Sequence, residues 1–207
     1  YRTLLHYLKR RGIVVTEYKL RKVIKKFSLQ IKPKRKFVKT TDSNHPHPVY
    51  PNLVKDQEVT KINEVWVADI TYIRIVNGFV YLAVILDLYS RKVIGWSISK
   101  SIDSELTLSA LQMAYRRRTP SNGVIHHTDR GVQYLSNKYV IFLKEHGFKI
   151  SCSAKGNPYD NAFAESFMKT LKVEEVYLFN YETIIDVSER VGRFIEEVYN
   201  FKRVHSS

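Results

Sequence analysis

The sequence has a single cysteine and no long hydrophobic run. Because Cys152 is the only cysteine among 207 residues, it forms no disulfide within the chain, and it lies in no metal-ligand spacing. The most apolar stretch, residues 75–90, carries Asn77 and Asp87, whereas a bilayer span needs about 18 to 20 apolar residues. A secretory signal is also missing. These absences argue against a membrane or secreted protein and favour a cytoplasmic one.

Acidic residues are scarce at one end of the chain. Residues 1–39 hold 14 Lys and Arg but a single acid, Glu17, which gives a net charge of +13. Residues 40–207 hold 20 basic and 19 acidic residues, a net charge of +1. A hydrophobic content of 44% is enough for a packed core, which argues against a disordered polycation. A basic segment on a nearly neutral body predicts a polyanion-binding element, with nucleic acid as the expected partner.

Two short helices are predicted in residues 1–31. Apolar residues recur at helical spacing in residues 4–8 and 18–27, Gly12 separates the two runs, and Thr16 is a candidate N-cap for the second. Two helices with a tight connection are typical of a helix-turn-helix DNA-binding element. The alternative is an amphipathic hairpin whose solvated face is basic. The predicted DNA contacts on the second helix are Lys22, Lys25 and Lys26.

Residues 32–63 are predicted to be an extended linker. The prolines at positions 46, 48 and 51 disfavour regular structure and restrict the residues before them. The linker begins with the basic sequence KPKRK, which can follow a phosphate backbone. The DNA contacts predicted here are Lys34, Arg35 and Lys36.

Residues 64–207 predict an α/β body. A three-stranded meander followed by alternating helices and strands favours a mixed five-stranded sheet flanked by helices. The predicted strands cover residues 65–75, 79–88, 92–99, 123–127 and 148–153, and the predicted helices cover residues 103–117, 137–146, 159–173 and 181–201.

Three acidic residues of the body stand in positions that suggest chemistry. Asp69 lies in the middle of an apolar strand, where an ionised carboxylate is costly unless a cation or hydrogen bonds compensate. Asp129 follows the fourth strand, at the strand end where α/β sheets bind ligands. Glu165 lies on a helix. Two of them have a structural alternative: Asp69 bonds to backbone or arginine, and Glu165 forms a surface pair with Lys169.

Helix phasing separates two faces of the helix that carries Glu165. The apolar face is predicted to pack on the body and contains Phe163, Phe167 and Leu171. The face with Glu165 also presents Asn161, Lys169 and Lys172. Three acids on a strand, a strand end and a helix can converge on hard divalent cations, which prefer oxygen ligands. Two such cations can activate the attacking oxygen and stabilise the leaving oxygen of a phosphodiester.

The words around these acids resemble a known family. WVADITYI, HHTDRGVQY and GNPYDNAFAESFMKTLK, with 35 residues between Asp129 and Glu165, are similar to the catalytic motifs of DDE transposases with a retroviral-integrase-like core. The resemblance is greatest to the catalytic subunit of the insertion-sequence-three family. It extends to residues 1–24, 86–96 and 199–207.

The resemblance implies a ribonuclease-H-like fold and names the site. Asp69, Asp129 and Glu165 are implied as catalytic ligands of two Mg²⁺ or Mn²⁺ ions, and Lys172 as a DNA-contacting residue. Lys169, Asn161 and Lys155 are further predicted DNA contacts. Because family members continue beyond the terminal HSS and carry further N-terminal sequence, we expect additional residues at both ends of this chain.

The function predicted from these features is DNA transposition by cutting and joining of strands, with DNA as partner and a homo-oligomer on DNA. Two alternatives remain open: a ribonuclease-H-like nuclease without strand transfer, and an inactive DNA-binding relic. Other polar residues are predicted to be structural. His126 is interpreted as a packing residue, no role is favoured for His127, and Asp87 is predicted to pair with Arg91 in a turn. Trp66, Trp96 and most tyrosines are predicted as core or surface residues.

Overall fold

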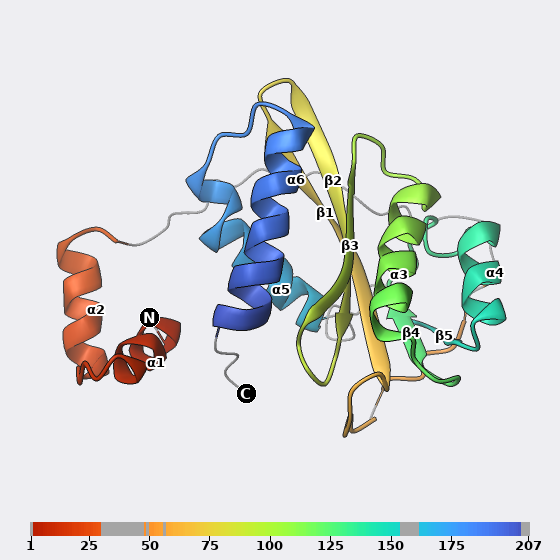
Figure 1. Ribbon diagram of the computed structural model, residues 1–207, viewed down its shortest axis with the longest axis horizontal. Helices are drawn as coiled ribbons and strands as arrows, with labels where there is room; N and C mark the ends of the chain where they lie inside the picture. Colours follow the sequence, from red (N-terminus) through yellow and green to blue (C-terminus); the bar gives the residue numbers. More distant parts are fainter. Residues whose placement is uncertain (1, 30–47, 49, 56, 154–161, 204–207) are drawn as a thin grey trace.

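The computed structural model describes residues 2–29, 48, 50–55, 57–153 and 162–203. Its centre is a mixed five-stranded sheet in the order β3-β2-β1-β4-β5, with helices on both faces (Figure 1). β2 pairs antiparallel with β1 and β3, and β1 pairs parallel with β4, so the predicted meander and mixed sheet are confirmed. The strands are β1 (Val65–Ile75), β2 (Gly78–Asp87), β3 (Val93–Ser99), β4 (Ile125–Thr128) and β5 (Lys149–Cys152).

The helices follow the predicted order. The predicted final helix begins only at Ile184, after a capping box between Thr183 and Asp186, while Tyr181 forms a β-bridge with Ile75. The helices of the chain are α1 (Arg2–Arg10), α2 (Glu17–Lys26), α3 (Ser104–Arg118), α4 (Asn137–Glu145), α5 (Ala162–Glu174), the 3₁₀ turn η2 (Val176–Leu178), α6 (Ile184–Arg193) and its π-helical continuation η3 (Phe194–Lys202). None of the helices described has both the length and the apolar character needed to cross a membrane.

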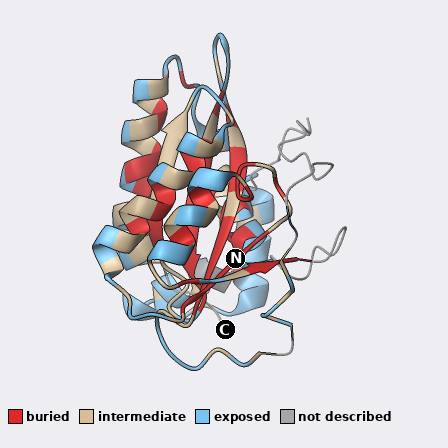
Figure 2. Ribbon diagram, turned by 90° about the vertical axis from the view of Figure 1, so that its right-hand side faces the viewer, coloured by how far each residue is buried: buried red, intermediate tan, exposed pale blue. Residues whose placement is uncertain are grey.

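β1 is buried on both faces, as its apolar run predicts. Successive residues of a strand point to opposite faces. Val67 and Ile73 belong to the core cluster shared with α5 and α6, whereas Trp66 and Ala68 belong to the cluster under α3 and α4. Figure 2 shows buried residues concentrated in the strands and on the helix sides that face them. By this alternation, Asp69 lies on the sheet face that α5 covers.

Helix α3 lies unusually close to β3 at Gly95. A Cβ atom added there would lie 2.2 Å from the carbonyl oxygen of Ala110 and 2.7 Å from the backbone nitrogen of Ala114. Both contacts are with helix backbone, which cannot move without shifting the whole helix. Glycine at this position therefore sets the distance between α3 and the sheet.

Gly95→Ala is expected to lower the free energy of unfolding by about 3 kcal/mol, the upper part of the range for overpacking a core. The added methyl group forces α3 away from the cluster that it covers. Urea denaturation measures the loss. Ser97→Ala on the same strand, at a partly exposed side chain, is the control and should change stability by less than about 0.5 kcal/mol. Equal stability of Gly95→Ala and wild type contradicts the close approach.

Part of the predicted linker lies against the edge strand β5. The amide of Cys152 donates to the carbonyl of Pro51 (3.3 Å), and the amide of Leu53 donates to Ser151 Oγ (2.9 Å). Val54 and Val59 pack against the core. These contacts cover strand-edge groups that would otherwise be open to pairing with another chain.

The predicted pairing of Asp87 with Arg91 is wrong. The buried Asp87 carboxylate accepts hydrogen bonds from the amides of Asn63 (2.7 Å) and Ser90 (2.7 Å) and from Ser90 Oγ (2.7 Å). Among the described residues no ion pair joins it to Arg91, whose guanidinium lies 3.9 Å from the ring centroid of Phe163. Because the turn supplies Ser90 and the segment before β1 supplies the amide of Asn63, hydrogen bonds rather than a cation stabilise this carboxylate.

The two N-terminal helices form as predicted, and Thr16 caps α2 by accepting from the amide of Lys19 (3.3 Å). Their apolar residues are less covered than the helical pattern suggests. Leu20 is buried, whereas Tyr18 and Phe27 are exposed. The helices are thus present, and their role in DNA binding stays a prediction.

Candidate catalytic site

β1 and β4 bring the first two predicted catalytic acids together. In the parallel register of these strands, Val67 pairs with His127. Carried two residues further, the same register sets Asp129, just beyond the end of β4, beside Asp69 in the middle of β1. The convergence follows from non-local strand pairing, so two acids 60 positions apart in the sequence become neighbours.

Backbone amides hold both carboxylates. Asp69 Oδ1 accepts from the amide of Ile70 (2.8 Å), and Asp129 Oδ1 accepts from the amide of Gly131 (2.9 Å). Both aspartates are partly buried. A hydrogen bond to the charged form favours ionisation, but at Asp69 this effect is smaller than the opposing effect of burial.

Glu165 lies in the first turn of α5, and its negative charge acts on Asp69. Phe167 and Leu171 on the opposite side of this helix are fully buried in the core, as the helix phasing predicts, and Glu165 is exposed. The prediction was wrong for Phe163, which is 38% exposed and lies under the guanidinium of Arg91. This contact ties the beginning of α5 to the β2–β3 turn.

The pKa of Asp69 responds to the charges of the other two predicted catalytic acids. Burial and, after it, the negative charges of Asp129 and Glu165 together raise the pKa of Asp69 to about 7, while the Ile70 amide and Lys172 oppose the change. A carboxyl group whose pKa is raised by two other carboxylates is the signature of acids that share one small region.

Lys172 lies on the same face of α5 as Glu165, about two helical turns further along. Its ammonium nitrogen is 4.6 Å from the ring centroid of Tyr72 on β1, a cation–π distance. Burial lowers the pKa of Lys172, and the charge of Asp69 acts in the opposite direction. The structure therefore places Lys172 within electrostatic reach of Asp69.

The three acids approach one another without a closed ligand set. Over the residues that the structure describes, no group of three His, Cys, Asp or Glu side chains is close enough to hold a metal ion. The oxygen donors nonetheless have the chemistry that Mg²⁺ and Mn²⁺ prefer. A cation between them would also relieve the repulsion that raises the pKa of Asp69.

Comparisons with known proteins identify the family of the chain. Residues 59–158 match the family described as "Integrase core domain", and residues 146–207 match a second family with the same description. The chain is 41% identical over 196 residues to the insertion element IS600 uncharacterized 31 kDa protein of Shigella sonnei, which covers 94% of this chain and 72% of that protein. The chain belongs to the integrase-core transposases of insertion sequences.

Two further comparisons support the family and the fold. The chain is 43% identical over 184 residues to Transposase InsF for insertion sequence IS3A of Escherichia coli K12, across 88% of this chain and 64% of that protein. The catalytic core domain of HTLV-2 integrase in complex with magnesium superimposes with a TM-score of 0.50 and 19% identity, over 66% of this chain and 88% of that one. The ribonuclease-H-like fold of integrase cores is thereby confirmed.

The structure describes some of the other DNA contacts predicted for this integrase-core transposase. On the described helices, Lys22, Lys25, Lys26 and Lys169 are exposed and available to a phosphate backbone. The remaining predicted contacts lie outside the described residues; they are Lys34, Arg35, Lys36, Lys155 and Asn161.

The two histidines of β4 make packing contacts in this transposase. His126 is buried, and its Nε2 lies 2.7 Å from the hydroxyl of Tyr139. Burial lowers the pKa of His126 to about 3, helped by His127, so the ring is neutral in the core, as its interpretation as a packing residue requires. His127 Nδ1 lies 2.8 Å from Ser151 Oγ and so bridges β4 and β5.

Tyr134 is a core residue whose hydroxyl is influenced by two of the predicted catalytic acids. It was included among the tyrosines expected to fill core or surface, yet the charges of Asp69 and Asp129 act on its buried hydroxyl. The available signal was its place in the turn that follows Asp129, within HHTDRGVQY. A hydroxyl so close in sequence to a catalytic acid merits separate consideration from apolar aromatic residues.

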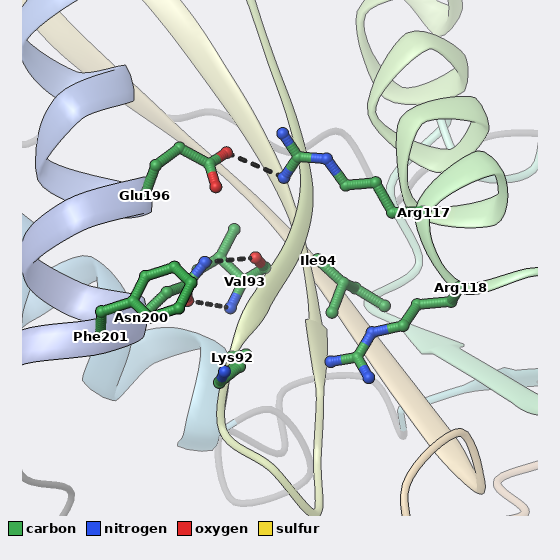
Figure 3. Close-up of a pocket in the computed structure, with 8 residues that line it drawn as sticks. All are labelled: Lys92, Val93, Ile94, Arg117, Arg118, Glu196, Asn200 and Phe201. Carbon is green, nitrogen blue, oxygen red and sulfur yellow. Dashed lines mark hydrogen bonds and ion pairs between the residues drawn. The ribbon is translucent and has the colours of Figure 1, made fainter.

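A separate pocket lies where β3, α3 and η3 of the transposase meet (Figure 3). Asn200 of η3 accepts from the amide of Val93 and donates to its carbonyl, both at 2.9 Å. Nearby, Glu196 pairs with Arg117 (2.8 Å) and accepts from Trp96 Nε1 (2.8 Å). These contacts fasten η3 to the edge strand, and none of the three catalytic acids lines the pocket.

Proposed function

We propose that this chain is the catalytic core of a transposase that cuts DNA at the ends of an insertion sequence and joins the freed 3′-OH to target DNA. The observation that carries the proposal is the convergence of Asp129 and Glu165 on Asp69 from three separate elements. The family of the chain supports the same reaction.

Asp69, Asp129 and Glu165 would hold two Mg²⁺ or Mn²⁺ ions. The magnesium in the HTLV-2 integrase core supports this assignment. Bound divalent ions supply activation of the attacking oxygen and stabilisation of the leaving oxygen. The carboxylates hold the ions and do not attack phosphorus, so neither a covalent protein–DNA intermediate nor ATP is required.

The basic residues would position the DNA. Lys172, beside Asp69, is assigned to a phosphate of the strand that is cut. The basic residues of 1–39, with Lys169, Lys155 and Asn161 near the catalytic helix, are assigned to the backbone further along the duplex. Because two element ends must be joined, we also propose that the chain acts as a homo-oligomer on DNA in the bacterial cytoplasm.

A strand-transfer assay tests the proposal. The chain is incubated with Mg²⁺ or Mn²⁺, a supercoiled target plasmid, and a labelled duplex that ends in the terminal sequence of its own element with a free 3′-OH. Covalent joining of the label to the plasmid is the expected result, and it should disappear when EDTA is added.

The two alternatives predict different products. A nuclease cuts the duplex in a metal-dependent reaction without transferring the label to the plasmid. An inactive relic binds the duplex with an affinity that falls steeply with salt and is unchanged in Asp69→Asn, without cutting or joining. Either outcome contradicts strand transfer by this chain.

A further inference from the structure

Tyr134 and Asp129 are held by one turn. The amide of Tyr134 donates to the carbonyl of Gly131 (3.0 Å), and the amide of Gly131 donates to Asp129 Oδ1 (2.9 Å). The ring of Tyr134 packs edge-on against Tyr139, with centroids 5.6 Å apart. Backbone and ring are therefore both fixed, so the direction of the Tyr134 hydroxyl is set by the same turn that sets Asp129.

The hydroxyl of Tyr134 is buried without a hydrogen-bond partner among the described residues. The residue is 3% exposed, so the hydroxyl does not face bulk solvent. Tyr139 provides the contrast, because its equally buried hydroxyl bonds to His126 (2.7 Å). Buried polar groups in native proteins nearly always have partners, and an exception calls for a functional explanation.

The orphan hydroxyl lies near the catalytic carboxylates. Burial raises the pKa of Tyr134 well above its usual value, and the charges of Asp69 and Asp129 raise it further. The phenol therefore stays protonated, and its hydroxyl is a hydrogen-bond donor close to two carboxylate acceptors. Carboxylates that bind metal ions are themselves commonly held by hydrogen bonds from a surrounding shell of residues.

We propose that Tyr134 is a positioning residue of the metal site, whose hydroxyl donates a hydrogen bond to the Asp69–Asp129 carboxylate pair when divalent ions draw these side chains together. The inference rests on the proposed function. The loaded site supplies the partner that the hydroxyl lacks in the metal-free protein. Metal binding and satisfaction of the hydroxyl are then one event, and the hydroxyl contributes to metal affinity without touching DNA.

Tyr134→Phe tests the inference because it removes the hydroxyl and keeps the ring. Mn²⁺ affinity is measured by electron paramagnetic resonance, on the free chain and on the chain bound to a DNA duplex. Thermal unfolding is measured on the metal-free chain. We expect Mn²⁺ affinity to fall about tenfold, the lower end of the effect of residues that support metal ligands. The metal-free melting temperature should stay equal or rise, because a buried unsatisfied group is lost.

Tyr139→Phe is the matched control. It removes a buried hydroxyl from the neighbouring ring, and that hydroxyl has its partner in His126. We expect a lower melting temperature and unchanged Mn²⁺ affinity. If Tyr134→Phe binds Mn²⁺ as tightly as wild type, the inference is overturned, and the buried hydroxyl has no role in metal binding.

Asp129→Asn separates this failure from failure of the proposed function. If wild type binds Mn²⁺ and Asp129→Asn does not, the metal site is as proposed, and the result for Tyr134→Phe decides the inference alone. If Asp129→Asn leaves Mn²⁺ binding unchanged, or wild type binds none with or without DNA, the proposed metal site is wrong and the inference fails with it.

Discussion

Asp129→Asn is expected to reduce metal-dependent cutting and joining by at least about 10³-fold, the scale seen when one member of a catalytic unit is lost. The amide removes one negative charge from a group that would hold divalent ions, and it keeps the size of the side chain. Rates of strand transfer with a labelled 3′-OH donor, at saturating Mg²⁺, measure the effect. Glu165→Gln should reduce activity by a similar factor, because it also removes one negative charge from the proposed metal ligands. Its effect on the fold should be small, because Glu165 is exposed.

The substitution leaves the local fold intact by design. Asn retains the side-chain oxygen that accepts from the amide of Gly131, so the turn after β4 should form as in wild type. Binding of a DNA duplex at moderate salt should change little, because the basic residues are untouched. Activity retained within tenfold of wild type would refute the assignment of Asp129.

Asp103→Asn is the matched control for Asp129→Asn. Asp103 caps α3 by accepting from the amide of Leu106 (3.0 Å), and asparagine caps helices about as well as aspartate. The same chemical change, at a carboxylate that also accepts a backbone hydrogen bond, should therefore leave strand transfer unchanged. Loss of activity in both variants would point to a general effect of charge.

The sequence predicts the sheet well because its strands carry strong local signals. The apolar run of β1 and the turn at Gly78 identify the central hairpin, and the pattern of alternating elements identifies the crossover to β4. The individual positions of Asp69 and Asp129 were likewise predictable. Their approach was less so, because it depends on the register between strands that are distant in sequence; the placement of the acids showed only that they can converge.

The errors share a physical cause. Asp87 and Arg91 look complementary in sequence, yet a tight turn brings backbone amides to the carboxylate first. Tyr134 belongs to the core, as expected, and only tertiary packing shows that its hydroxyl has no hydrogen-bond partner among the described residues. Phe163 fits the apolar phase of α5, but it lies in the first turn, where the helix extends past the core. A sequence pattern gives the periodicity of apolar residues, whereas the contacts of these side chains depend on tertiary packing.

Asp69→Asn is expected to stabilise the metal-free protein by about 4 kcal/mol at pH 8 and by little at pH 4. In the folded chain the pKa of Asp69 is about 7, raised from an ordinary value of 3.8. Between these values the folded state keeps a proton that the unfolded state releases, so stability falls as pH rises from about 4 to 7. Each tenfold change in proton affinity is worth about 1.4 kcal/mol.

A comparison between variants is needed because His126 acts in the opposite direction. Its pKa is lowered from 6.5 to about 3 by burial, so the unfolded state binds the proton in this window and stability rises with pH. The two effects partly cancel in the wild-type curve. Urea denaturation of wild type and Asp69→Asn, each with EDTA at pH 4 and pH 8, removes the contribution of His126 by subtraction. An equal difference at both pH values would show that Asp69 titrates normally.

Addition of Mg²⁺ at pH 8 links this stability to the catalytic site. A cation that binds the folded chain stabilises it according to its concentration and affinity, and between these carboxylates it also relieves the repulsion that destabilises ionised Asp69. Mg²⁺ should therefore raise the free energy of unfolding of wild type and have little effect on Asp69→Asn. Equal stabilisation of both proteins would place the bound ion elsewhere. If the ion binds at the proposed site, the low stability of the ionised Asp69 and the stabilisation by Mg²⁺ have the same origin, the repulsion of Asp69 by Asp129 and Glu165.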